Sequence, residues 1–354
     1  MSAFPPRPEP FRIEPVFSPR IWGVRSLAPL FPEKINLAEP LGEAWLTGTD
    51  CAIATGPLAG RSLGAAWHEM SPAWRGSSLS GVRDFPLLAK FIFPKEKLSI
   101  QVHPDDAYAS IHEKAAGGRG KTEMWHIVSA EPSAHLLAGL KQGVTKERFL
   151  EGLAAHTIEG LLHAHHVRAG ETFFIPAGTP HTIGTDMVVC ELQEYSDLTY
   201  RIYDYGRVDT HGKPRELHIE KALEVIHFGY SHEGKVPPIA LGPSRHDAKL
   251  LCACPYFAAE RLEFYERYEF ASDSERFQLL IVLTGRGNLG WPAGAALYNA
   301  GECWFLPASA DLAALHPVQP TAVLRAYIPD IAALSRRLHE SGVSSSAISQ
   351  AVFA

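Results

Sequence analysis

The sequence predicts a mainly β protein with two domains, and three features support this prediction. Segments with the residue pattern of strands dominate both ends of the chain, whereas a helical stretch interrupts the first half. Residues 229–245 are rich in glycine and proline and show no periodicity, which is typical of a connection between domains. The length of 354 residues also suits two cores better than one. We therefore expect one domain over residues 1–240 and a second over residues 241–354.

The first half begins with strands and then turns helical. Residues 85–104 (FPLLAKFIFPKEKLSIQVHP) hold two apolar runs separated by a polar turn, which predicts paired strands. Residues 105–114 start with two aspartates suited to a helix N-terminus and end before a pair of glycines. A second helical stretch is expected over residues 145–162, with Thr145 as a possible N-cap. Together these segments predict a helical insertion over about residues 105–162.

Strands resume after this insertion and continue in the second half. The remaining elements that the patterns predict are strands over residues 167–175, 188–192 and 198–203 and a helix over residues 219–226. Residues 280–290 (LIVLTGRGNLG) predict a strand, a tight turn and another strand. The last periodic segment predicts a helix over residues 330–340 that closes on Gly342.

Charge and composition argue against several classes of partner. The chain has 33 basic and 39 acidic residues, a net charge of −6, and no dense run of lysine and arginine. No apolar stretch approaches the roughly 18 residues of a membrane span, and the proline-rich N-terminus lacks the apolar core of a signal peptide. The five cysteines are scattered, which is typical of reduced, buried thiols. We expect a cytoplasmic protein that binds neither nucleic acid nor a membrane.

One stretch, GETFFIPAGTPHTIG, has a spacing that points to a β-barrel. From Gly170 it reads glycine, five residues, Pro176, one residue, Gly178, two residues and His181. Gly170 permits a tight turn, Pro176 ends strand pairing, and Gly178 lets the backbone bend so that His181 enters the barrel. The spacing resembles the second signature of the cupin superfamily of small β-barrels. The resemblance implies that the fold is two cupin-type jelly rolls, with the helical insertion in the first.

Four residues could hold a metal inside the first barrel. Gln101 and His103 stand two apart in LSIQVHPDD, so their side chains point to the same face of a strand. Cupins commonly have a histidine where this chain has Gln101. Glu123, 20 residues beyond His103, is the best carboxylate candidate, and His181 adds a second imidazole. This set suits one catalytic Zn²⁺ per chain with room left for substrate.

Two other stretches bear on the number of metals. The run HAHH (residues 163–166) has ligating side chains, but adjacent histidines point apart and no carboxylate stands beside them, so we expect no metal there. In the second half, GECWFLPASADL repeats the spacing from Gly301 through Pro307 and Ser309, but Leu312 stands where the first copy has a histidine. We therefore expect a metal-free second barrel with a buried Leu312 and a structural or gating task.

Several long blocks resemble one narrower family, the type I phosphomannose isomerases, and most closely their short bacterial form. The blocks are PLLAKFIFPKEKLSIQVHPDD, GKTEMWHIV, FFIPAGTPHTIG, ELQEYSDLTYRIYDYGR, RELHIEKALEVI and CPYFAAERLEF. They occur in order over nearly the whole chain, which makes the resemblance specific. One departure is IWGV (residues 21–24), where the family often has a second glycine after Trp-Gly. The resemblance implies a zinc enzyme that interconverts mannose 6-phosphate and fructose 6-phosphate.

The resemblance also implies roles for individual residues. Moving a proton between C1 and C2 through an enediolate needs a base, a stabiliser of negative charge and a grip on phosphate. Glu191 is the first choice for the base, with Lys121 or a metal ligand as open alternatives. Arg201 can stabilise the enediolate or assist ring opening. The residues assigned to the phosphate clamp are Arg207, Lys90 and Ser99.

Two other functions remain open at this point. A cupin metal oxygenase would prefer iron and would not need the added lysine and arginine grip on phosphate. A non-catalytic protein that binds sugar phosphates would share the binding residues, and only turnover would separate it from an enzyme. For both the isomerase and the non-catalytic protein, the expected partner is a small sugar phosphate. We expect the protein to be a monomer.

Overall fold

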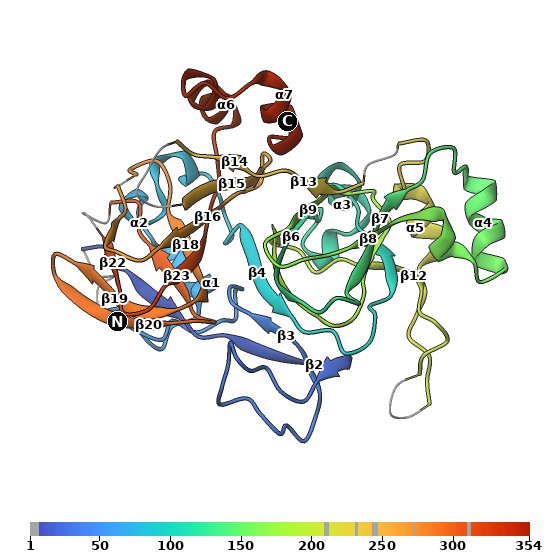
Figure 1. Ribbon diagram of the computed structural model, residues 1–354, viewed down its shortest axis with the longest axis horizontal. Helices are drawn as coiled ribbons and strands as arrows, with labels where there is room; N and C mark the ends of the chain where they lie inside the picture. The colour runs from blue at the N-terminus through green and yellow to red at the C-terminus, as the bar shows by residue number, and fades with distance from the viewer. Residues whose placement is uncertain (1–6, 209–211, 231–232, 243–246, 272, 310–312) are drawn as a thin grey trace.

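The computed structural model describes residues 7–354 except 209–211, 231–232, 243–246, 272 and 310–312. The described part is mainly β, and Figure 1 shows two β-rich halves side by side, with the last two helices lying across one edge of them. No helix in this part of the chain is long and apolar enough to span a membrane. The predicted site of Leu312 lies outside the described residues.

The first half contains two open sheets. The seven strands of sheet one, in spatial order, are β13 (Lys235–Val236), β9 (Thr172–Ile175), β6 (Glu123–Ala130), β11 (Met187–Glu194), β4 (Leu87–Ile92), β3 (Leu41–Trp45) and β2 (Val16–Val24). The five strands of sheet two are β12 (Tyr200–Tyr203), β5 (Ile100–Val102), β10 (His181–Ile183), β7 (His135–Leu140) and β8 (Leu162–His166). A shared apolar core, which includes Trp125, Ile127, Leu136 and Ile183, joins the two sheets face to face.

The second half has the same two-sheet arrangement. Sheet three is β1 (Phe11–Ile13), β21 (Cys303–Leu306), β18 (Gln278–Thr284), β23 (Thr321–Tyr327), β16 (Ala258–Phe264), β15 (Asp247–Ala253) and β14 (Ile239–Ala240). Sheet four is β17 (Tyr268–Glu269), β22 (Ala314–Pro317), β19 (Arg286–Trp291) and β20 (Gly294–Asn299). Their shared core includes Leu280, Leu289, Trp304 and Leu315.

Sheets one and three lie back to back, and this packing joins the halves. One continuous core combines Phe91 and Cys190 of sheet one with Ile281 and Phe305 of sheet three. The inner strands of both sheets, among them β4, β11, β18 and β23, are therefore buried on both faces, which explains why they read as apolar runs rather than as an alternation. The five cysteines, all free, are buried in or beside this region.

The helices of the described residues lie beside these sheets or in the connections between their strands. They are α1 (Leu63–Glu69), α2 (Pro72–Arg75), α3 (Asp106–His112), α4 (Lys146–Ala154), α5 (Ile219–Val225), α6 (Ile331–Glu340) and α7 (Ser345–Ala351), with 3-10 turns η1 (Ser77–Leu79), η2 (Lys114–Ala116) and η3 (Ile158–Leu161). Residues of α4, η3 and α5 cover the outer face of sheet two. The predicted N-cap Thr145 is confirmed, since it accepts the Arg148 N–H at 3.3 Å. Asp330, predicted as the first residue of the last helix, is the N-cap of α6 and accepts the Ala333 N–H at 2.9 Å.

Two sequence predictions about the first half need correction. Residues 85–104 do form two strands, but β4 belongs to sheet one and β5 to sheet two, so they are not paired with each other. The polar turn between them carries the chain from one sheet to the other. Residues 105–162 are not helical throughout, because β6 and β7 lie between α3 and α4. These two strands are almost fully buried and lack the alternation that marks a half-exposed strand.

Strand pairing also crosses the predicted domain boundary. Phe11 of β1 pairs with Phe305 of β21, so the N-terminal strand extends the second half's sheet. Residues 239–240 form its other edge strand, β14. The division into residues 1–240 and 241–354 stays a prediction.

Candidate active site and metal centre

A cavity of about 440 Å³ opens between sheets one and two, at the end where β5, β6 and β10 bring their polar residues together. Its lining comes from both sheets and from the loops beside them: Pro19, Arg20, Ile21, Trp22, Glu43, Lys90, Ile92, Leu98, Ser99, Gln101, Lys121, Ile183, Glu191, Asp197, Thr199, Arg201 and Arg215. Six predicted site residues are therefore in the wall of one cavity: Lys90, Ser99, Gln101, Lys121, Glu191 and Arg201.

The three strongest predicted metal ligands meet at one point beside this cavity. One ligand atom from each of His103, Glu123 and His181 lies within 4.8 Å of the others, and all three side chains are buried. The Nε2 atom of His181 is 3.3 Å from Glu123 Oε1, and the Nε2 atom of His103 is 3.6 Å from Glu123 Oε2. Among the described residues this is the group that could hold a metal ion.

The hydrogen bonds of the two histidines fix which ring nitrogen faces the cluster. His103 Nδ1 lies 2.6 Å from the Leu198 carbonyl oxygen, and His181 Nδ1 lies 2.8 Å from the Thr179 carbonyl oxygen. A carbonyl oxygen only accepts, so each Nδ1 carries the proton and each Nε2 presents a lone pair. Burial, together with the charge of Lys121, lowers the pKa of His181 to about 3, which keeps the ring neutral. Neutral imidazoles with free Nε2 atoms are the form that binds metals.

The charges around the cluster favour a cation. Three buried carboxylates (Glu43, Glu123 and Glu191) outnumber the two buried ammonium groups of Lys90 and Lys121. Burial and the Glu191 carboxylate raise the pKa of Glu123 to about 7, against the opposing effect of Lys121. Glu123 Oε1 is buried without a hydrogen-bond partner, although it faces the His181 ring. Such an oxygen fits a divalent cation, which would complete its coordination.

Gln101 reaches the cluster because its strand lies next to that of His181. The two residues are direct partners across β5 and β10, and the Gln101 amide nitrogen is 3.3 Å from His181 Nε2. In this orientation the amide donates a hydrogen bond, and its oxygen, 3.5 Å from the Ser99 hydroxyl, is turned away. Reversing the amide would present the oxygen instead. Ligation by Gln101 stays a prediction.

Glu191 is held in the cavity wall by neighbours on both sides of β11. Its Oε1 accepts a hydrogen bond from Trp125 Nε1 at 2.9 Å, and its Oε2 is 2.7 Å from Lys90 Nζ. The ion pair is short, but it lacks the angle of a hydrogen bond, so Oε2 keeps hydrogen-bonding capacity toward the cavity. Burial alone would raise the pKa of Glu191, but Lys121 and Lys90 outweigh burial and lower it to about 2. Glu191 is therefore an ionised carboxylate.

Lys121 links the metal cluster to the cavity. Its Nζ is 3.1 Å from His103 Nε2 and in close contact with Glu123 Oε2. Its backbone follows Gly120, where an added Cβ would lie 2.6 Å from the backbone of Asp105 and Asp106. This close approach of the two backbones brings Lys121 and Glu123 to the place where β5 ends.

Arginines also line the cavity or stand close to its wall, and two of them, Arg207 and Arg215, share one carboxylate. Arg201 and Arg215 line the wall, and the buried Nε of Arg201 has no hydrogen-bond partner. Asp204 Oδ2 accepts from Arg215 Nε at 2.8 Å, and Asp204 Oδ1 accepts from Arg207 at 2.5 Å. Arg207 also donates to the Lys97 carbonyl oxygen at 2.6 Å. Arg207 thus stands behind Asp204 and is the predicted clamp residue that does not line the cavity.

Sequence reasoning missed several residues of the wall. They are Arg20, Glu43, Asp197, Thr199 and Arg215. Arg215 lies in RELHIEKALEVI, a block that resembles the family. A positive charge in this block, just before a predicted helix, could have marked Arg215 as a candidate site residue. Glu43 and Arg20 carry no such signal, because only the pairing of β3 with β4 sets Glu43 near Lys90, and only the pairing of β2 with β3 sets Arg20 beside Glu43.

Comparisons with known proteins point to one enzyme family. Residues 11–139 match the family model described as phosphomannose isomerase type I, catalytic domain. Mannose-6-phosphate isomerase ManA of Bacillus subtilis is 34% identical over 313 residues, which cover 84% of this chain and 93% of that protein. Mannose-6-phosphate isomerase of Streptococcus mutans is 32% identical over 285 residues, which cover 79% and 87%.

Solved structures show the same likeness. The crystal structure of the mannose 6-phosphate isomerase from Bacillus subtilis matches with a TM-score of 0.81 and 30% identity, over 90% of this chain and 99% of that one. A mannose 6-phosphate isomerase bound with zinc and yttrium shares the fold, with a TM-score of 0.69 and 17% identity over 90% and 99% of the two chains.

Proposed function

The chain belongs to the type I phosphomannose isomerase family and interconverts mannose 6-phosphate and fructose 6-phosphate, and we propose here which of its residues carry the reaction. The observation that carries the proposal is the convergence of His103, Glu123 and His181 beside a cavity that also holds Lys121 and Glu191. The relatives are isomerases, which does not favour the oxygenase or the non-catalytic alternative.

We infer that the metal is zinc, one ion per chain. Two imidazole nitrogens and one carboxylate form a common set for catalytic zinc, and Gln101 stands ready as a fourth neighbour. When bound, the ion supplies a Lewis acid that polarises substrate oxygens without redox chemistry. His103 and His181 keep the orientation that this needs because backbone carbonyls hold their Nδ1 protons.

Proton transfer is assigned to Glu191. The reaction removes a proton from C2 of open-chain mannose 6-phosphate, passes through an enediolate and returns a proton to C1. Glu191 is ionised and faces the cavity, so it can accept and return that proton. Lys90 and Trp125 hold its carboxylate in place. Lys121 is the alternative base. With Glu191 as the base, Lys121 instead acts as an ammonium group that stabilises the negative charge developing on the substrate oxygens.

The phosphate group is assigned to the arginines of the cavity wall. Arg201 and Arg215 present guanidinium groups there, and Ser99 adds a hydroxyl. Arg207 acts through Asp204, which it shares with Arg215, and so fixes the position of Arg215. Lys90 is a lesser member of the proposed phosphate clamp than the arginines, because its Nζ already lies 2.7 Å from Glu191 Oε2. Arg201 can also assist ring opening, since its Nε has no partner.

We further propose that each pair of sheets is a cupin-type jelly roll, the first catalytic and the second free of metal. The shared cores between sheets one and two and between sheets three and four support this description. We also propose a monomeric, cytoplasmic enzyme with no nucleic-acid partner. The net charge of −6 supports the last point.

Turnover tests the proposal directly. The protein is stripped with a chelator, reloaded with Zn²⁺ and assayed for fructose 6-phosphate formed from mannose 6-phosphate. We expect no activity after stripping and full activity at one zinc per chain. Activity that persists in protein free of metal would refute the metal site, and binding of sugar phosphate without turnover would identify a non-catalytic protein.

A further inference from the structure

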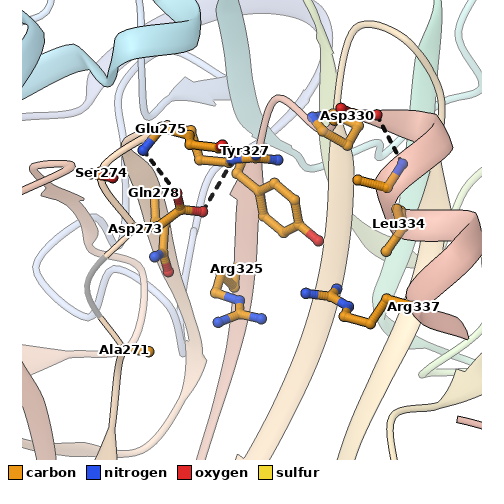
Figure 2. A pocket seen from close by; sticks show the side chains of 13 residues that line it. Ala271, Asp273, Ser274, Glu275, Gln278, Arg325, Tyr327, Asp330, Leu334 and Arg337 are labelled. Atoms are coloured by element: carbon orange, nitrogen blue, oxygen red, sulfur yellow. Dashed lines mark hydrogen bonds and ion pairs between the residues drawn. The ribbon is translucent and has the colours of Figure 1, made fainter. Parts of the chain in front are cut away.

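A second, larger cavity lies in the other half of the molecule, and it contains none of the active-site residues. It measures about 510 Å³, within the range of small-molecule sites. Its polar lining consists of Asp273, Ser274, Glu275, Arg276, Gln278, Arg325, Tyr327, Asp330 and Arg337. Figure 2 shows Arg337 extending from α6 toward the strand that carries Arg325 and Tyr327, with Asp273 and Glu275 on the opposite side.

Strand register shows that this cavity occupies the place of the active site in the second half. Glu123 of β6 pairs with Ile175, and Gln278 of β18 pairs with Leu306. Ile175 and Leu306 are each the last residue of their strand, before a proline. Gln278 therefore stands where the metal ligand Glu123 stands in the first half.

The next strands continue the same correspondence. Two residues along, Glu191 of β11 pairs with Lys90 of β4, and Arg325 of β23 pairs with Glu260 of β16. Both are ion pairs with at least one fully buried member, and the charges are exchanged between the halves. The second half thus keeps a polar, charged barrel mouth but replaces the metal ligand with an amide.

The cavity keeps hydrogen-bonding groups that nothing in the described structure satisfies. Gln278 is only 9% exposed, and its Oε1 is buried without a partner. The Nε atom of Arg325 is also buried without a hydrogen bond, whereas Arg276 Nε lies 3.1 Å from Asp273 Oδ2. Such groups cost stability unless a ligand or water completes them, so the two in this cavity wall indicate a binding site.

The charges of the wall decide the chemical class of the ligand. Three arginines, Arg276, Arg325 and Arg337, meet the three carboxylates of the wall and the buried Glu260 carboxylate beside it, so negative charge is in slight excess. A phosphate group only accepts hydrogen bonds; it would leave Gln278 Oε1 unpaired and would lie near Asp273 and Glu275. A hydroxyl group both donates and accepts, and so can serve the amide oxygen and the arginine nitrogens together.

We propose that this cavity binds an uncharged mono- or oligosaccharide through Gln278 and Arg325. A neighbouring cavity of about 440 Å³ shares Glu275, Arg276 and Asp330 with it, which gives room for more than one sugar ring. The proposal does not depend on the isomerase assignment, because the two cavities share no residue.

Binding of neutral sugars to the full-length protein tests the proposal. D-mannose, D-glucose, cellobiose and maltose are titrated by saturation-transfer NMR and calorimetry, with inorganic phosphate and mannose 6-phosphate in parallel. Gln278→Leu should weaken binding of the neutral sugar by about tenfold or more. The same change should leave the unfolding midpoint nearly unchanged, because the lost oxygen has no partner in the free protein.

Two controls keep the test selective. Gln319→Leu makes the same replacement on an exposed turn of the same half and should leave sugar binding unchanged. Arg325→Lys keeps a cation beside Glu260 but removes Nε, so it should weaken sugar binding without loss of folding. The proposal is overturned if no neutral sugar binds, if binding survives Gln278→Leu, or if only phosphate or mannose 6-phosphate binds this cavity.

Discussion

Replacing Glu191 with glutamine separates the chemical and structural parts of the buried charge network. The side chains have nearly the same shape, and the new amide oxygen can still accept the hydrogen bond from Trp125. What the change removes is the negative charge 2.7 Å from Lys90 Nζ. Lys90 is 4% exposed, so its ammonium group cannot recover its hydration.

The structure sets the size of both effects. Removing one member of a buried ion pair costs up to about 3–5 kcal/mol of unfolding free energy, and the value should fall at the low end here because Glu43, 3.9 Å from Lys90 Nζ, still compensates part of the lysine charge. Adding Lys90→Met should return most of that stability, since both charges are then gone. Loss of a general base should lower kcat by about 10²- to 10⁴-fold, whatever the stability.

Three measurements on the Glu191→Gln protein test this reasoning. Denaturant unfolding gives the stability, mass spectrometry the bound zinc, and a coupled assay of fructose 6-phosphate the kcat well below the unfolding temperature. Zinc content should stay at one per chain, because Glu191 is not a ligand. A folded, zinc-loaded variant with kcat within tenfold of the wild-type value would refute Glu191 as the base and favour Lys121.

Other substitutions test the remaining assignments. His181→Ala should reduce zinc affinity by at least about 100-fold and remove activity with it, because even residues that only contact a metal ligand are worth 10- to 100-fold in affinity. As a control, His126→Ala removes a buried histidine from the same half and should keep its zinc by metal analysis. Arg207→Ala should raise KM for mannose 6-phosphate about 10-fold or more while KM for mannose changes little, and equal effects on both sugars would place Arg207 outside the phosphate clamp. Gly178→Ala should lower the thermal unfolding midpoint and kcat together, because Gly178 has a φ of +79° and an added Cβ would lie 2.7 Å from the His227 ring. Unchanged values would show that the backbone before His181 does not require glycine at this position.

The metal cluster could be predicted from the sequence more completely than the architecture around it. His103, Glu123 and His181 were predictable because the metal requires these residue types and the spacing from Gly170 to His181 is specific. The turn geometry was also readable, since Gly170 and Gly178 both have positive φ. Each of these features depends on local chemistry that a short stretch of sequence contains, although the three ligands come from three such stretches.

Pairing between distant strands could not be read in the same way. β4 and β5 follow each other in the chain but lie in different sheets, and β1 joins a sheet formed otherwise by residues after 238. The inner strands of sheets one and three are buried on both faces, so their sequences do not show which neighbour each one takes. The placement of Arg207 behind Asp204 was hidden for a related reason, because only the loop after β12 brings Arg215 between Arg207 and the cavity.

The metal's position tests the central claim most directly. Crystals of the zinc-loaded protein soaked with fructose 6-phosphate are measured on both sides of the zinc absorption edge, so that an anomalous difference map locates the ion. We predict one zinc per chain, bound by Nε2 of His103, Nε2 of His181 and the Glu123 carboxylate, with the sugar between the ion and Glu191. A zinc peak away from these three side chains, or a sugar phosphate bound outside the cavity that Glu191 and Arg201 line, would contradict the account.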